Sequence, residues 1–287
     1  MAYANGFNGD VIQLNYILQT LEEKTYAIPG VTCDDNLSVS LNGESFSYWI
    51  RSAASGEINQ NLGAQVSFQT TGTKRVDKSF TKAATIKDVI PAVNYQTVSA
   101  DVVGDRVILN TITVANKLNE LFVDTALDNA VGSAQGAVWD GSPDTVYAYV
   151  LALRAAFRKA NEAHNVEPTA CFVSSDVYSA MLAKNIIIFK DGKRFGELLG
   201  FAVIEVPHLD DKSFIMLNAK GMIDARNINN LMVTDATPAG YPNGTLIAGE
   251  MGYFIDASEL VKVGEAVAFG SAESPVPEKL IMKATAA

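Results

Sequence analysis

The side chains best suited to chemistry in this chain are its few cysteines and histidines. Cys171 lies in the apolar run ACFV, and His164 lies shortly before it in the sequence, so the two suggest a Cys/His pair for nucleophilic catalysis. The alternative is that ACFV is a short buried strand, in which a thiol behaves as a small hydrophobic side chain. We favour this second interpretation and expect no catalytic residues.

Motifs that bind metals or phosphates are also missing from the sequence. Cys33 and Cys171 are too far apart to fit a metal or redox spacing, which favours two reduced thiols in a cytosolic protein. The glycines at 192, 196 and 200 are spread over a predicted turn and strand. They do not follow a strand and open a helix, as a dinucleotide-binding loop requires. We therefore expect no cofactor.

Two carboxylate pairs could in principle bind calcium. The residues of Asp34–Asp35 and of Asp210–Asp211 are adjacent in sequence, so in an extended chain their side chains point apart. Solvated loops are the simpler interpretation, and calcium binding is the weaker one. We expect no metal site.

The composition excludes several classes of function. The 32 acidic and 22 basic residues give a formal net charge of −10, which disfavours direct binding to DNA or RNA. A container that does not adhere to its nucleic acid remains compatible with this charge. The N-terminus lacks the basic start and apolar run of a signal peptide, and no segment is long and apolar enough to span a membrane. We expect a protein made in the cytoplasm.

The residues that follow the N-terminus predict a helix and then a hairpin. Apolar residues recur at helical spacing from Val11 to Leu21, and Pro29–Gly30 breaks the chain. Alternating apolar residues over 37–41 and 46–50 flank the turn Asn42–Gly43, which predicts two paired strands.

The most distinctive segment is Arg51 to Lys82. It has strand-like flanks but few large apolar side chains, so it cannot form a core of its own. Folded back near Gly63–Ala64, it would reach roughly 50 Å at the rise of an extended strand. We expect this arm to be buried against a neighbouring copy of the chain, with the aromatic residues at its root as anchors.

The remaining sequence predicts a mixture of helices and strands, which gives an α+β fold. Residues 97–131 have the pattern of the longest helix, with Gly132 as its stop. Ser142–Pro143–Asp144 is expected to open a second helix by capping. A buried strand over 170–173 and a helix over 177–184, capped by Ser174 or Ser175, come next. Further strands are expected at 75–86, 186–189, 200–206 and 214–217 and in the closing section GEMGYFIDASELVKVGEAVAFG, which follows the Pro/Gly-rich stretch TDATPAGYPNGT.

This order of elements resembles the major capsid protein of tailed double-stranded-DNA phages, the Hong Kong ninety-seven type of shell subunit. The most specific stretch is Leu153 to Val206. There, RAAFRKANEAHNVEPTACFVSSDVYSAMLA looks like the helix, buried strand and helix of that family, and FGELLGFAVIEVPHL looks like its leucine-glycine-aromatic strand. These are signatures of a fold and not of an active site.

The resemblance implies a division of the chain. Residues 1–35 become the N-arm, 36–90 the E-loop hairpin with adjoining strands of the peripheral domain, and 91–135 the spine helix of that domain. Residues 136–235 become the axial domain, and 236–287 return to the peripheral domain. Because the chain begins at Met1, a separate scaffolding protein is favoured over a removed N-terminal segment.

The resemblance also implies a function in self-assembly. The expected product is an icosahedral phage head of pentamers and hexamers that encloses DNA without sequence-specific binding. It is part of the virion and is assembled in the bacterial cytoplasm. The implied partners are many copies of the chain itself, a scaffolding protein, a portal and, as an option, decoration proteins. An encapsulin-type nanocompartment shell, a small-molecule α/β enzyme and a tail-tube protein are the alternatives.

Residues at the arm and on one helix are the candidate contacts between subunits. They are Trp49, Arg51, Leu62, Val66, Phe68, Lys74, Arg75, Arg154 and Arg158. The two helical arginines could instead simply be solvated. Some members of the family join a loop lysine covalently to an asparagine beside an acid, for which this chain offers Lys74 or Lys78 with Asn243 and Glu250. Most members form no such bond, so solvated lysines are the simpler expectation.

Overall fold

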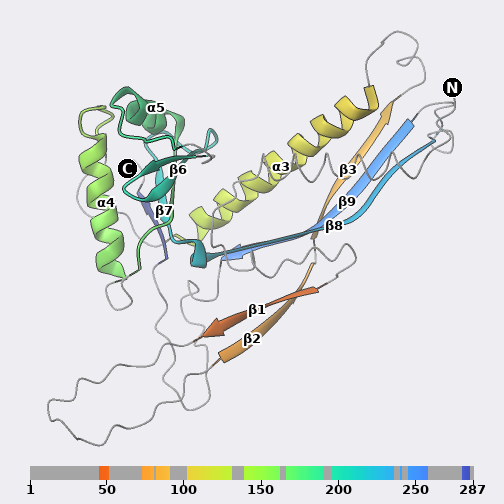
Figure 1. The fold of residues 1–287 in the computed structure, drawn as a ribbon, viewed down its shortest axis with the longest axis horizontal. Helices are drawn as coiled ribbons and strands as arrows, with labels where there is room; N and C mark the ends of the chain where they lie inside the picture. Colours follow the sequence, from red (N-terminus) through yellow and green to blue (C-terminus); the bar gives the residue numbers. More distant parts are fainter. Residues whose placement is uncertain are drawn as a thin grey trace, which may run out of the picture.

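A computed structural model describes most of the predicted elements. The described residues are 45–51, 73–80, 82–90, 102–130, 139–161, 166–190, 195–235, 240, 245–257 and 280–284. The predicted N-terminal helix, the strand over 37–41 and the stretch 52–72 lie outside them. The described strands form sheets of five, three and two strands, accompanied by three α-helices (Figure 1).

The five-stranded sheet is the centre of one folded part, which we call the compact domain. Its strands are β4 (Ala170–Val173), β5 (Gly196–Leu198), β6 (Phe201–Glu205), β7 (Phe214–Leu217) and β10 (Ile281–Ala284). They lie in the order β10-β7-β4-β6-β5. Only β4 and β6 are parallel; the other pairs are antiparallel. The C-terminal strand β10 therefore closes one edge of a sheet that is otherwise made from residues 170–217.

Both faces of this sheet are buried, which explains why its strands read as continuous apolar runs. Along β4, Ala170 and Phe172 join one core cluster, while Cys171 and Val173 join the other. This alternation follows from the two-residue period of a strand. All four residues of β4 and of β7 are buried. The predicted bounds 170–173 and 214–217 are thereby confirmed.

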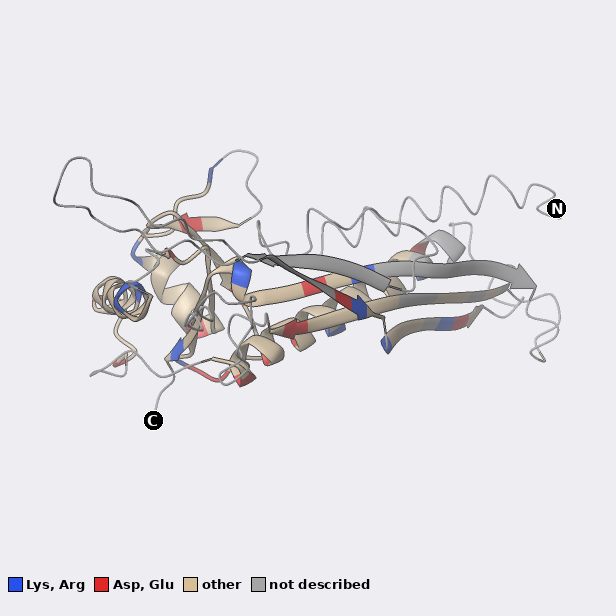
Figure 2. Ribbon diagram, turned by 90° about the horizontal axis from the view of Figure 1, so that it is seen from below, with Lys and Arg blue, Asp and Glu red and all other residues tan. Residues whose placement is uncertain are grey.

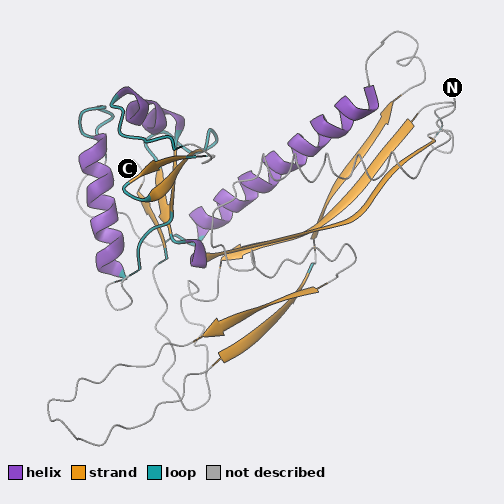
Figure 3. Ribbon diagram, in the orientation of Figure 1, coloured by secondary structure: helices purple, strands orange, loops and turns teal. Residues whose placement is uncertain are grey.

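Helices α4 (Val146–Ala160) and α5 (Ser175–Ala183) cover one face of the sheet (Figure 3). Val146, Val150, Leu153 and Phe157 form the buried stripe of α4, as the helical spacing predicts. The predicted start of this helix at Ser142–Pro143–Asp144 is wrong. Residues 143–145 form a turn, the N-cap residue is Thr145, and the Thr145 hydroxyl donates to Asp140 Oδ1 at 2.6 Å. The capping signal therefore belongs to a turn that precedes the helix.

The second folded part is an elongated sheet with one long helix along it. Its strands β3 (Lys82–Ile90), β9 (Thr245–Ala257) and β8 (Met222–Asp235) are antiparallel in the order β3-β9-β8. A short 3-10 helix, Ala219–Gly221, leads from β7 into β8. Helix α3 (Val102–Asp128) runs beside this sheet (Figure 1). The helix predicted over 97–131 is confirmed over residues 102–128.

The C-terminal end of α3 joins the two parts. Phe122, Val123 and Ala126 belong to the core cluster on the second face of the five-stranded sheet. The rings of Phe122 and Phe172 meet edge to face with centroids 6.0 Å apart, a favourable geometry for aromatic pairs. On the surface of the joint, His208 Nε2 lies 3.4 Å from Asp124 Oδ1. The long helix therefore belongs to the elongated part along most of its length and to the compact domain at its end.

The third sheet is a ribbon of two strands, β1 (Ser45–Arg51) and β2 (Thr73–Ser79). The single predicted strand over 75–86 is in fact two strands, β2 and β3, which belong to different sheets. Likewise, the predicted strand over 186–189 is reduced to one bridge between Ile188 and Glu197. No described helix is long and apolar enough to cross a membrane.

Candidate functional site

The structure tests whether Cys171 could act as the nucleophile of a Cys/His pair. Cys171 lies in the centre of the compact domain and is fully buried, and this burial raises the pKa of its thiol to about 12. Because the thiolate is the nucleophilic form, Cys171 is unsuited to covalent catalysis at neutral pH. His164 lies outside the described residues. Within the described part of the chain, no group of three or more His, Cys, Asp or Glu side chains is arranged to hold a metal ion.

A thiol reagent provides a direct check on Cys171. In a Cys33→Ser variant, where Cys171 is the remaining thiol, Ellman's reagent is expected to react at least 100-fold more slowly in the native protein than in denaturant. The reason is burial together with the raised pKa. Rapid labelling of the native protein would show that the strand opens readily or that the thiol is exposed.

The charges of the described residues do not form a surface suited to a polyanion. Acidic and basic positions are interspersed over the helices and strands (Figure 2), and several pair within the chain. Lys117 Nζ contacts Glu120 Oε2 at 2.8 Å, and Arg226 binds the Asp224 carboxylate through two nitrogens at 2.8 and 2.7 Å. The chain has a net charge of −10, and its described residues do not gather their basic groups on one face that could bind a polyanion.

The β1–β2 ribbon brings four of the predicted contact residues together. Its antiparallel register places Trp49 opposite Arg75, Ile50 opposite Lys74 and Arg51 opposite Thr73. Leu62, Val66 and Phe68 lie outside the described residues. Among the described strands, no third strand pairs with this ribbon, and an isolated two-stranded sheet is marginally stable in water. The ribbon is thus a structural element that needs further contacts.

One observed contact connects the ribbon to the elongated sheet. The Lys78 ammonium lies 5.9 Å from the centroid of the Phe254 ring, at the outer limit of a cation–π interaction. Glu250 lies on the same strand as Phe254, opposite Thr85 of β3. Asn243 lies outside the described residues, so the covalent cross-link stays untested, and solvated lysines remain the expectation.

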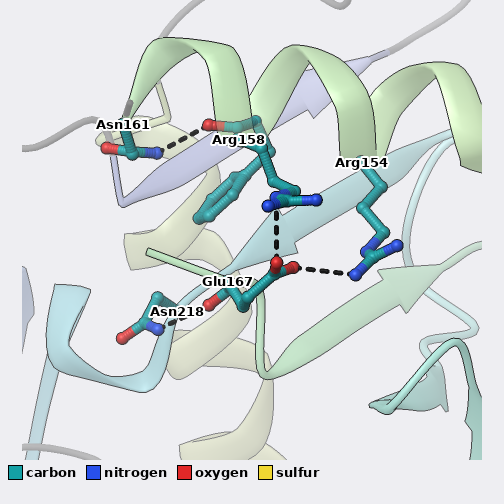
Figure 4. A network of polar contacts seen from close by, with 6 residues as sticks. Arg154, Arg158, Asn161, Glu167 and Asn218 are labelled. Atoms are coloured by element: carbon teal, nitrogen blue, oxygen red, sulfur yellow. Dashed lines mark hydrogen bonds and ion pairs between the residues drawn. The ribbon is translucent and has the colours of Figure 1, made fainter. Parts of the chain in front are cut away.

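The two arginines predicted at a subunit contact both reach the same carboxylate of their own chain. Arg154 Nη2 lies 3.0 Å from Glu167 Oε2, and Arg158 Nε lies 2.8 Å from Glu167 Oε1 (Figure 4). The Asn218 side-chain amide donates to the Glu167 carbonyl at 2.7 Å. This network fastens α4 to the segment that leads into β4. Any role for these arginines between subunits stays a prediction.

Sequence reasoning missed Glu167 as the partner of these arginines. Glu167 lies thirteen positions after Arg154 in the sequence, on the segment that leads into β4. No spacing rule reaches that far along the sequence, because side-chain pairs on a helix form only between residues three or four positions apart. The only available signal was the excess of positive charge at the end of α4.

A second polar cluster fixes the loop between β6 and β7. The Asp176 carboxylate accepts the backbone N–H of Lys212 at 3.0 Å and a hydrogen bond from the Ser174 hydroxyl. The Ser174 hydroxyl in turn accepts the N–H of Ser213 at 3.2 Å. Lys212 has φ = 62°, a left-handed conformation that is costly for a residue with a side chain. The hydrogen bonds from the start of α5 hold this turn in place.

Asp176 makes the stability of the compact domain depend on pH. Partial burial opposes its ionisation, but hydrogen bonds from Ser174 and from backbone N–H groups outweigh this effect and lower the pKa of the carboxyl group. A lowered folded-state pKa stabilises the fold above the unfolded-state pKa of about 3.9, and this stabilisation is lost as pH falls through the folded value. We expect Asp176→Asn to cost about 1 kcal/mol at pH 7.

The measurement is thermal or urea unfolding of the wild type and Asp176→Asn at a series of pH values. The difference in stability between them is expected to shrink as pH falls below about 4. Asp211→Asn, a change to an exposed carboxylate of the same loop, is the matched control and is expected to have little effect. A cost for Asp176→Asn that stays constant from pH 7 to pH 3 would contradict the assignment.

Comparison with known protein families identifies the class of protein to which this chain belongs. A family model described as phage capsid protein matches residues 92–269. This match covers more than half of the chain, and the protein belongs to the phage capsid protein family. It is a structural protein of the bacteriophage particle and not an enzyme, and capsids are assemblies of many copies. No curated protein sequence matches the chain.

The fold comparison agrees with the family. A structure from Mycobacterium phage Che8 has a TM-score of 0.53 at 12% identity, with 85% of each chain covered. The head structure of Helicobacter pylori bacteriophage KHP40 gives 0.52 at 9% identity, covering 86% of this chain and 84% of that one. A virus-like particle from Pyrococcus furiosus gives 0.50 at 13% identity, covering 85% and 96%. At such identities the similarity concerns the fold alone.

Proposed function

We propose that this chain is the major capsid protein of a tailed phage and forms the pentamers and hexamers of an icosahedral head that encloses double-stranded DNA. The observation that carries the proposal is the match to the phage capsid family over residues 92–269. The long helix beside an elongated sheet, joined to a compact domain, supports the Hong Kong ninety-seven type of subunit.

In this proposal each part of the fold has a place in the shell. The compact domain, whose strands β4 to β7 lie within the expected range 136–235, is the axial domain near the centre of a capsomer. Strand β8 of that range lies in the elongated sheet, and β10 comes from the expected range 236–287. The elongated sheet with α3 is the peripheral domain with its spine helix, and the β1–β2 ribbon is the root of the E-loop. The segment 52–72, whose two ends join the paired strands β1 and β2, is the strap that contacts a neighbouring subunit.

The surface charge suits the inside of a DNA container. A shell protein must release its contents and needs no sequence-specific contact. Within the described residues, several basic groups pair with acids, as at Glu167 and Asp224. A net charge of −10 also limits adhesion to DNA. Scaffolding and portal proteins are the further partners that this function requires.

A second function is supported by one specific observation. The Pyrococcus furiosus virus-like particle shares the fold, and 96% of its chain is covered. A protein compartment that encloses an enzyme would use the same subunit architecture. The two functions differ in what the particle contains and not in how the subunit folds.

The contents of native particles distinguish these functions. Particles captured from a lysate of the host with an antibody against this chain would be treated with nuclease and then opened. We expect nuclease-protected double-stranded DNA of uniform length in icosahedral heads. A protein cargo without DNA would favour the compartment, and cylinders would indicate a tail tube.

A further inference from the structure

The outer face of helix α4 is apolar although it is exposed. Its exposed positions over the first three turns are Tyr147, Ala148, Leu151, Ala152 and Ala155, and Tyr147 and Leu151 are 40% and 38% exposed. Charged residues begin with Arg154, in the C-terminal half of the helix. A helix that is apolar on both its buried and its outer face is normally covered on both.

Helix α3 provides an internal comparison. Its exposed positions include Leu109 but carry charges along the helix, at Asp105, Arg106, Lys117, Asp124 and Asp128, and this is the composition of a face in contact with water. The difference between the two helices shows that the apolar face of α4 is not a general property of this chain. It points to a surface that another protein covers.

A second exposed apolar group lies elsewhere on the same domain. Ile188 and Phe189 are both 60% exposed. The backbone of Ile188 exchanges two hydrogen bonds with Glu197, of 2.9 and 2.8 Å, and Ile187 packs into the core. A Cβ atom at Gly196 would lie 2.0 Å from Ile187 Cγ2, so glycine is needed for this close approach. These contacts fix Ile188 and Phe189 as a projecting apolar knob.

The knob and the α4 face lie toward opposite ends of the five-stranded sheet. The strand order is β10-β7-β4-β6-β5, and the bridge to Glu197 places Ile188 beside β5 at one edge. Helix α4 packs over the other side, where Tyr149 meets Phe214 of β7 with centroids 4.9 Å apart. In Figure 1, α4 lies at the outer left of the domain. One subunit therefore has two different apolar surfaces on two different flanks.

We propose that the Ile188–Phe189 knob of one copy packs against the outer face of α4 in the next copy around a capsomer. This inference rests on the proposed function and names the contact that closes its rings. A ring requires a heterologous contact, in which one patch meets a different patch of an identical neighbour. Two unlike apolar surfaces on opposite flanks satisfy that requirement.

The shapes of the two surfaces are compatible. Ala148, Ala152 and Ala155 follow one another at four and three residues, so they form a row of small side chains along the helix. Tyr147 and Leu151 form a parallel ridge of large side chains beside this row. A projecting phenylalanine can enter such a groove as one side-chain ridge enters the groove of a neighbouring helix.

Cross-linking of assembled particles tests the contact. In a Cys33→Ser background, Ala152→Cys and Phe189→Cys would be combined in one chain and treated with a short bismaleimide. We expect a ladder of linked subunits up to pentamers and hexamers on a denaturing gel. Each variant with only one of the two added cysteines should give monomers, because the remaining Cys171 is fully buried. The control pair, Thr113→Cys on the polar face of α3 with Phe189→Cys, should give no ladder.

The outcomes separate this contact from the proposed function. Closed shells that stay monomeric after treatment, or that cross-link equally well through Thr113, would overturn the contact and leave the capsid function intact. Absence of shells when the wild-type chain is expressed together with its scaffolding protein would overturn both. Hydroxyl-radical footprinting of wild-type shells covers the case in which the cysteine variants do not assemble. We expect Tyr147, Leu151 and Phe189 to lose reactivity at least fivefold on assembly, and unchanged reactivity would overturn the contact.

Discussion

Replacing residues 56–72 with a short Gly/Ser turn is expected to abolish closed shells and leave a folded subunit. The strands that flank this segment, β1 and β2, pair with each other, so a short turn can connect them. The segment is poor in large apolar side chains, and its removal should cost the compact domain nothing. If the segment is a strap, its loss removes part of the large buried area that obligate assemblies require. We expect shell yield to fall at least tenfold.

Sedimentation on a sucrose gradient and negative-stain microscopy measure the yield, and far-UV circular dichroism checks the fold. A Gly/Ser linker of the original length is the matched control, because it keeps the reach of the segment and removes its side chains. If both variants fail equally to form shells, the side chains of the strap, and not its length, are needed for assembly. Normal shells from the shortened variant would contradict the strap role.

Phe172→Ala is expected to destabilise the compact domain by about 3–5 kcal/mol, the usual cost of removing a buried aromatic side chain. Phe172 is fully buried on β4 and meets Phe122 of α3 edge to face. The cavity would therefore lie at the joint between the compact domain and the long helix. Because total stabilities are only about 5–15 kcal/mol, we also expect a large loss of soluble protein.

Urea unfolding of the subunit measures this cost. Leu109→Ala is the control, since Leu109 lies on the same helix as Phe122 but is 57% exposed. It is expected to change stability by less than about 0.5 kcal/mol. Similar costs for the two variants would show that the joint is not part of the core.

The compact domain was the easiest part to predict because its patterns are local. A strand buried on both faces gives a short continuous apolar run, which is why ACFV and FIML were recognised with their bounds. The buried stripe of α4 follows directly from the helical period. The sequence resemblance to the capsid family, carried by the same region, agrees with the family match.

The elongated sheet was harder to predict because its strands are polar. Strand β8, MIDARNINNLMVTD, was not recognised, since asparagine and aspartate are uncommon in strands. Its pairing with β9 includes a register shift between Ile228 and Asn230, which breaks any simple alternation. Strand β10 was missed because its four residues follow a long stretch without periodicity and pair with β7, far away in sequence.

The polar contacts could not be predicted for a related reason. Glu167 and Asp176 find their partners through chain reversals and across loops, where no sequence spacing applies. The ribbon register that joins Trp49 to Arg75 likewise depends on the length of the segment between the two strands. Such contacts follow from the tertiary fold, and the sequence indicates only the charges available for them.

A cryo-electron microscopy reconstruction of the assembled wild-type chain tests the central claim most directly. We expect a closed shell in which residues 52–72 of each subunit lie against a different subunit. A chain that stays monomeric when it is expressed together with its scaffolding protein, or a reconstruction in which those residues pack wholly on their own subunit, would contradict this expectation.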